Sequence, residues 1–72
     1  MKVFITAPSI EAYSNYWKRE KLDPNKVFYC EDENKMAYEL GLLWDKDIKA
    51  KGVVVNDMGH AIRFHDLEQD LD

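Results

Sequence analysis

The sequence predicts an α/β fold: a small single-layer sheet of three parallel strands plus a C-terminal antiparallel strand, in the order β-α-β-α-β-β, with two helices packed on the sheet. Three short apolar runs carry this prediction, at residues 3–5, 27–30 and 53–55. They are rich in β-branched and aromatic residues, which fit a pleated, buried surface. Each run is separated from the next by a stretch long enough for the crossover helix that parallel strands require.

Two strand orders are compatible with this pattern, because crossovers between parallel strands are right-handed in either one. The order 2-1-3-4 places one helix on each face of the sheet. The order 1-2-3-4 places both helices on one face and leaves the other for a partner or a second copy. The apolar character of the three runs indicates that both faces are covered, but the sequence leaves both orders open.

The first crossover is predicted to hold a helix. Pro8 ends the first strand, and Ser9 is a suitable N-cap for the residues that follow it. Ile10, Tyr13 and Trp17 then recur at spacings of three and four, which places them on one helical face.

Aromatic residues are the one compositional excess, and several of them crowd this helix. A single helix can hardly bury Ile10, Ala12, Tyr13, Tyr16 and Trp17 together, because the arc they cover is too wide for one small sheet face. We therefore expect Tyr13 or Tyr16 to lie at the surface. Tyrosine is enriched at protein contacts because it buries a large area with few rotatable bonds.

A second helix is predicted after the second apolar run, with Asp32 as its N-cap. Its apolar positions follow a helical spacing: Met36, Ala37, Leu40, Leu43 and Trp44. Gly41 interrupts this pattern. Either the helix tolerates Gly41, or it ends there with Gly41 as a left-handed cap. We expect the helix to end between Leu40 and Trp44.

The remaining residues predict a hairpin and a tail. Residues 56–59 (NDMG) favour a tight reversal. Residues 61–65 alternate, with Ile62 and Phe64 on one face and Arg63 and His65 on the other, as expected of a half-solvated antiparallel strand. The α/β domain is therefore predicted to span residues 1–65, followed by an acidic tail, 66–72. The tail either forms a last helical turn or frays.

The composition indicates the cellular location of the protein. The chain has 72 residues and a single cysteine, so it can form no internal disulfide. It contains no signal-peptide pattern and no apolar stretch near the ~20 residues of a membrane span. We expect a cytoplasmic protein without membrane contact.

Residues that could support catalysis or cofactor binding form no known motif. The loop at residues 6–9 has no glycine or lysine, and the loop at 30–33 is acidic, so neither resembles a phosphate-binding loop. Carboxylates next to Cys30 disfavour the reactive thiolate. His60 and His65 are five residues apart, a spacing that does not converge two imidazoles on one metal. We therefore predict no enzymatic activity, no cofactor and no metal.

Charge is distributed unevenly along the chain. The formal net charge is −4, and the acidic excess follows Cys30. Direct nucleic-acid binding is not expected, because the only basic cluster, residues 18–21, fits the C-terminal end of a helix. Acidic segments can instead complement a basic surface, including one that binds nucleic acid, and so speed association with a partner protein. The predicted protein-binding residues are Tyr13, Tyr16, Glu31, Asp32, Glu33, Asp66, Glu68 and Asp70.

The lone β-α-β-α-β unit, the opening at residues 3–9 (VFITAPS) and residues 16–19 (YWKR) are similar to small orphan proteins of bacteriophages. Some of these resemble a truncated Rossmann or P-loop domain without its nucleotide motif. The resemblance implies a binding protein that blocks a host or bacterial defence complex, as an anti-CRISPR or a similar anti-defence protein does. If the chain is phage-encoded, we expect it in the host cell cytoplasm. It covers most of the chain but contains no diagnostic motif, so it assigns no functional residue.

Two alternatives remain open. One is a minimal domain that binds a nucleotide or phosphate metabolite at the carboxyl ends of the parallel strands, using Ser9, Asp32 and Asn56. The other is a homodimer formed through an uncovered sheet face or through the edge of the fourth strand.

Overall fold

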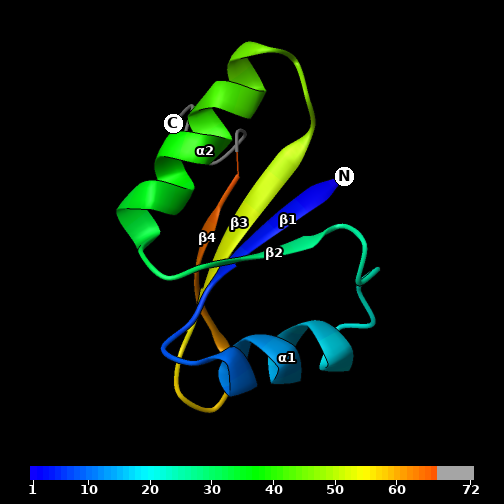
Figure 1. The fold of residues 1–72 in the computed structure, drawn as a ribbon, viewed down its shortest axis with the longest axis vertical. Helices are drawn as coiled ribbons and strands as arrows, with labels where there is room; N and C mark the ends of the chain where they lie inside the picture. The colour runs from blue at the N-terminus through cyan, green and yellow to red at the C-terminus, as the bar shows by residue number, and fades with distance from the viewer. Residues whose placement is uncertain (67–72) are drawn as a thin grey trace.

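The computed structural model of the chain describes residues 1–66, which form an α/β domain with two helices and a four-stranded mixed sheet (Figure 1). The elements in chain order are β1 (Lys2–Thr6), α1 (Ile10–Arg19), β2 (Val27–Cys30), α2 (Glu33–Asp45), β3 (Ala50–Val55) and β4 (Ala61–His65). The α/β class predicted from the sequence is confirmed.

The strand order of the sheet is β2-β1-β3-β4, which selects the first of the two predicted orders. The strand β1 is parallel to both of its neighbours, β2 and β3, and β4 is antiparallel to β3. In Figure 1 the strands lie between α1, at the bottom of the view, and α2, at the upper left. Alternate residues of the strands belong to two separate core clusters, one packed against each helix. The described helices therefore cover opposite faces of the sheet.

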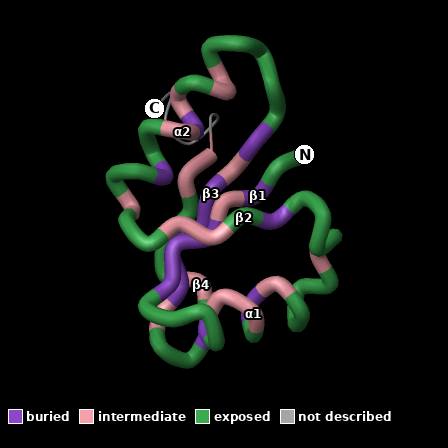
Figure 2. The backbone as a smooth tube through the Cα atoms, in the orientation of Figure 1, coloured by how far each residue is buried: buried purple, intermediate pink, exposed green. Residues whose placement is uncertain are grey.

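The cluster under α1 is built mainly from β1 and β3. Ile5 and Val53 are fully buried there, and Ala12 and Tyr16 of α1 pack onto them. Figure 2 shows the buried residues concentrated along these two central strands. The helix begins as predicted, because the Ser9 hydroxyl accepts a hydrogen bond from the Ala12 amide at 3.1 Å.

The cluster under α2 depends on a close approach at Gly52. Met36 and Leu40 are fully buried against Ala50 and Val54 of β3. A Cβ atom added at Gly52 would lie 2.8 Å from both Leu40 Cδ1 and Met36 Sδ. The glycine thus provides the space that the two α2 side chains occupy.

The C-terminal end of α2 differs from the prediction. The helix continues through Gly41 and ends at Asp45, so the expected end between Leu40 and Trp44 is wrong by one residue. The left-handed residue after the helix is Asp47, with φ 59°, and not Gly41. Hydrogen bonds from the Lys46 and Asp47 amides to carbonyls three residues earlier tighten the last turn and replace the predicted glycine cap.

The predicted reversal at residues 56–59 joins β3 to β4. The Asn56 amide donates to the His60 carbonyl at 2.9 Å, and Gly59 has φ 79°. A register shift at Val54 and Val55 marks a β-bulge beside this turn. The Arg19 guanidinium of α1 donates to the Gly59 carbonyl, so the turn is held against the first helix.

Candidate functional site

Polar side chains at the carboxyl ends of the parallel strands stabilise their own loops. Ser9, Asp32 and Asn56 each accept hydrogen bonds from backbone amides two to four residues later, at distances between 2.8 and 3.1 Å. These bonds cap α1 and α2 and close the β3–β4 turn. The backbone amides that a phosphate would need as donors here are therefore already engaged by these side chains, which does not favour a ligand site at this edge.

One of the predicted acidic contact residues is paired within the chain. Glu33, the first residue of α2, accepts two hydrogen bonds from Arg63 of β4, from Nε at 2.9 Å and from Nη2 at 2.7 Å. His65 Nε2 lies 2.7 Å from the same carboxylate. These hydrogen bonds lower the pKa of Glu33 from 4.5 to about 2. The Glu33 carboxylate therefore links α2 to β4 through hydrogen bonds within the chain, and its oxygens are already paired.

The other predicted acidic residues have different surroundings. Glu31 and Asp32 are exposed at the start of α2, where Asp32 serves as the N-cap. Asp66 is half-buried. Glu68 and Asp70 lie outside the described residues, together with most of the predicted tail.

Of the two tyrosines of α1, one of which was expected at the surface, Tyr13 is partly exposed and Tyr16 is buried. Tyr16 is only 7% exposed, and Tyr13 is half-buried, with its ring edge-on to Tyr29 at a centroid distance of 5.3 Å. The β3–β4 turn covers a second side of α1, because Gly59 approaches the backbone of this helix closely. The helix can therefore bury a wider arc than one sheet face allows, and Ile10 is the large apolar residue left outside, at 59% exposed.

A stacked pair of phenylalanines lies on the sheet face that α2 covers, with Phe4 on β1 and Phe28 on the edge strand β2. The rings of Phe4 and Phe28 are 5.3 Å apart with an interplanar angle of 28°. Phe28 is 38% exposed, because α2 packs mainly on β3 and β1 and leaves β2 partly uncovered. A hollow of about 680 Å³ separates this strand from α2. We call it the β2 groove; its lining includes Phe4, Phe28, Cys30, Glu31, Lys35 and Glu39.

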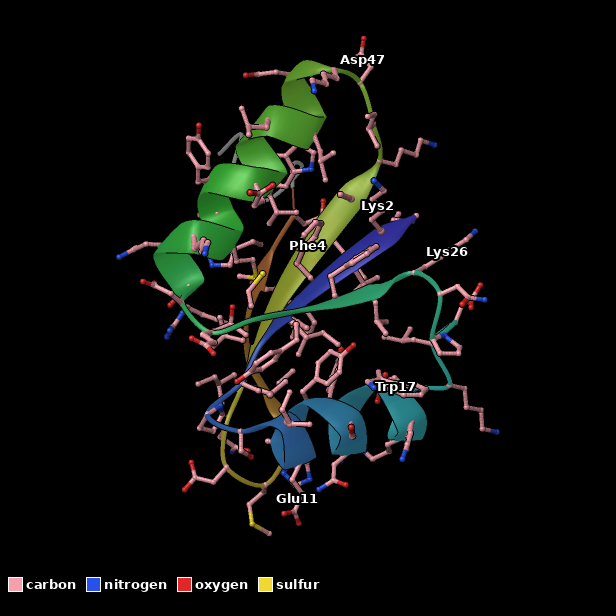
Figure 3. All side chains as sticks on the ribbon, viewed as in Figure 1. Lys2, Phe4, Glu11, Trp17, Lys26 and Asp47 are labelled. Carbon is pink, nitrogen blue, oxygen red and sulfur yellow. The ribbon has the colours of Figure 1, made fainter. Side chains whose placement is uncertain are left out.

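A second hollow, of about 390 Å³, adjoins the other side of Phe28. Three lysines line it, Lys2, Lys26 and Lys49, and we call them the lysine cluster. The Lys2 ammonium lies 6.0 Å from the centre of the Phe28 ring, within range of a cation–π interaction. Figure 3 shows Lys2 and Lys26 at the end of the sheet where β1 and β2 begin, with Phe4 further along β1.

Charge along β2 is therefore polarised around one aromatic residue. Of the residues that the structure describes, the lysine cluster and no carboxylate line the hollow at the start of the strand. Within the described part of the chain, the β2 groove at its end is lined by three carboxylates, those of Glu31, Asp32 and Glu39, and by one ammonium, that of Lys35. Sequence reasoning missed this arrangement, because its lysines come from three separate segments and Phe28 reads as an ordinary core residue of a strand.

Cys30 lines the β2 groove, where its surroundings raise the pKa of the thiol. Burial raises its pKa, the negative charge of Glu39 raises it further, and Lys35 only partly opposes them. The thiolate is therefore disfavoured, as the sequence predicted, although Glu39 rather than the adjacent acids is the charged neighbour responsible. Within residues 1–66, no group of three or more histidine, cysteine or acidic residues could hold a metal ion.

None of the helices within residues 1–66 is long and apolar enough to cross a membrane. Comparison of the chain with protein-family models, with curated proteins and with solved structures finds no match in any of the three.

Proposed function

We propose that this chain is a non-enzymatic protein-binding domain whose partner contacts the β2 groove. One observation carries the proposal, the stacked Phe4–Phe28 pair with Phe28 exposed beside an edge strand. Aromatic side chains held rigidly at a surface contribute strongly to binding, because they bury a large area and lose little conformational entropy. Stacking on Phe4 holds the Phe28 ring in position before any partner arrives.

The location differs from the contact surface expected from the sequence. Tyr16 is buried and Glu33 is paired with Arg63, so neither offers a free side chain to a partner. Of the predicted acidic residues, Glu31 and Asp32 border the β2 groove and belong to the proposed surface. The similarity to phage proteins extends the proposal to a partner in a host or bacterial defence complex.

Capture of a partner with matched variants tests the proposal. Phe28→Ser removes the exposed ring on one edge strand, and Phe64→Ser removes a ring that is 48% exposed on the opposite edge strand, β4. We expect the wild type and Phe64→Ser to retain the same stoichiometric partner from a bacterial lysate and Phe28→Ser to lose it. Circular dichroism and urea unfolding would first show that both variants are folded.

A partner retained equally by all three proteins would overturn the β2 groove as the contact surface. Recovery of no stoichiometric partner from lysates of several bacterial hosts would count against the binding function itself. Identification of the retained protein by mass spectrometry would show whether it belongs to a defence complex.

A further inference from the structure

We infer that the β2 groove binds an extended peptide segment of a partner protein, which adds to the sheet beside β2 with its acidic end at the lysine cluster and its basic end near Glu31 and Glu39. This inference rests on the proposed function and specifies the chemistry of the partner. Three features of the described residues support it: an open strand edge, an aromatic surface beside that edge, and opposite charges at its two ends.

The outer side of β2 has backbone groups available for a further strand. Within residues 1–66, β2 pairs only with β1, in parallel register. The Lys26 carbonyl accepts a hydrogen bond from the Val3 amide at 2.9 Å. Because alternate residues of a parallel strand bond to the same neighbour, Val27 and Tyr29 direct their amides and carbonyls away from β1. An unpaired edge of this kind is a template for strand addition.

The aromatic pair supplies a contact for side chains of the added strand. Phe28 lies in the middle of β2, between the two hollows. Side chains on one face of an extended peptide recur every second residue, so one apolar residue of the peptide would cover Phe28 while its neighbours on that face lie over the two hollows. The four residues of β2 match a peptide segment about 13 Å long.

Charge selects which peptides fit. A uniformly acidic segment is attracted by the lysine cluster but repelled by the carboxylates of Glu31 and Glu39. A uniformly basic segment is attracted by these carboxylates but repelled by the lysine cluster. A segment with an acidic end, an apolar centre and a basic end matches both ends of β2. The same polarity disfavours a single-stranded nucleic acid, which carries negative charge along its whole length.

Synthetic peptides with capped ends provide the test. All share a central valine-threonine-valine segment; one is flanked by two aspartates and two lysines, one by four aspartates and one by four lysines. Fluorescence anisotropy with the full chain should show that the dipolar peptide binds at least about tenfold more tightly than either uniform peptide. Its binding should be lost in Phe28→Ser and retained in Phe64→Ser.

A charge reversal makes the test sharper. In the double variant Lys2→Glu and Lys26→Glu, both ends of β2 become acidic, and the preference should switch to the uniformly basic peptide. Hydrogen exchange should show protection of the Val27 and Tyr29 amides when the preferred peptide is bound. Binding without that protection, or without a switch of preference, would overturn strand addition with charge selection.

Three further outcomes would also count against the inference. They are tighter binding of a fluorescent single-stranded oligonucleotide at the same surface, self-association of the chain that Phe28→Ser abolishes, and absence of binding by every peptide. If a lysate partner is still captured through Phe28 while all peptides fail, the proposed function stands and only the extended-peptide inference fails.

Discussion

Glu33 at the start of α2 and Arg63 in the edge strand β4 form a bidentate ion pair, with nitrogen–oxygen distances of 2.9 and 2.7 Å. The two residues are far apart in the sequence and belong to elements that no short connection joins. Planar guanidinium and carboxylate groups bind strongly in this geometry, because two parallel hydrogen bonds are each strengthened by charge. The pair fixes the N-terminal end of α2 over the edge of the sheet.

Replacing the carboxylate should change the pH dependence of stability. The folded-state pKa of Glu33, about 2, is below its ordinary value of 4.5. A lowered pKa stabilises the fold above the unfolded-state value, and that contribution is lost as the pH falls from about 4.5 towards 2. Glu33→Gln should therefore lower the free energy of unfolding by about 1 kcal/mol at neutral pH, the upper range for exposed pairs, and by less near pH 2.

Urea denaturation at several pH values measures this difference. Glu31→Gln, which removes the exposed neighbouring carboxylate, is the matched control and should change stability little. An effect of Glu33→Gln that is the same at pH 7 and pH 2 would show that the carboxylate does not stabilise the fold through its charge.

Two glycines should respond in opposite directions to alanine. At Gly59 the backbone has φ 79°, and a Cβ atom would lie 3.0 Å from Asn15 Cβ and 3.1 Å from the Ala12 carbonyl oxygen. Gly59→Ala should destabilise the domain by about 1–3 kcal/mol through backbone strain and crowding against α1. Gly41 lies inside α2 with open space around its Cα, so Gly41→Ala should stabilise by up to about 1 kcal/mol.

Thermal unfolding of both glycine variants measures the two opposite changes in stability. Equal effects of the two substitutions would contradict the left-handed turn and the close packing of the β3–β4 turn on α1.

The two tryptophans should differ in their tolerance of phenylalanine. The Trp44 indole donates a hydrogen bond to the Ala50 carbonyl at 2.9 Å, whereas the buried Trp17 indole nitrogen has no hydrogen-bond partner among residues 1–66. Trp44→Phe should cost about 1 kcal/mol more than Trp17→Phe, because it leaves a carbonyl unpaired, while Trp17→Phe removes an unsatisfied donor. Chemical denaturation of the two variants measures the difference, and a larger loss at Trp17 would argue against it.

Tyr16 should behave as a core residue and not as a contact residue. Tyr16→Ala should lower the free energy of unfolding by about 3 kcal/mol or more, as large-to-small substitutions in a core do. Ile10→Ala, on the exposed side of the same helix, should cost less than about 1 kcal/mol. Should Tyr16→Ala fail to fold, the milder Tyr16→Leu allows the same comparison by urea denaturation. A near-neutral effect at Tyr16 would contradict its burial.

The helix starts were predicted well because their determinants are local. Ser9 and Asp32 cap helices by binding amides two or three residues away, so residue type and position indicate the result. The end of α2 was predicted less well. Gly41 resembles a cap in the sequence, but the helix continues past it and buries Leu40 against β3, and packing of this kind outweighs a cost of about 1 kcal/mol.

The surroundings of Tyr16 and Glu33 could not be predicted from the sequence, because burial and ion pairing depend on segments distant in the chain. Tyr16 is buried in the cluster that includes Val53 and Val55 of β3, and Glu33 is paired with a strand thirty residues later. The residues next to Tyr16 and Glu33 in the sequence indicate neither the burial nor the ion pair. The sequence predicts Phe28 to be a core residue, because it lies within an apolar run. Nothing in that strand indicates that α2 leaves β2 partly uncovered.

The sequence by itself determined the three apolar runs, the α/β class, the helix caps and the reversal before β4, because each follows from interactions over a few residues. Tertiary structure decided the strand order, the burial of Tyr16, the Glu33–Arg63 pair and the exposure of Phe28 between opposite charges. These depend on where each helix crosses the sheet, and that position minimises the free energy of the whole core. The surface proposed for binding is what remains when α2 packs on the two central strands and leaves one edge open.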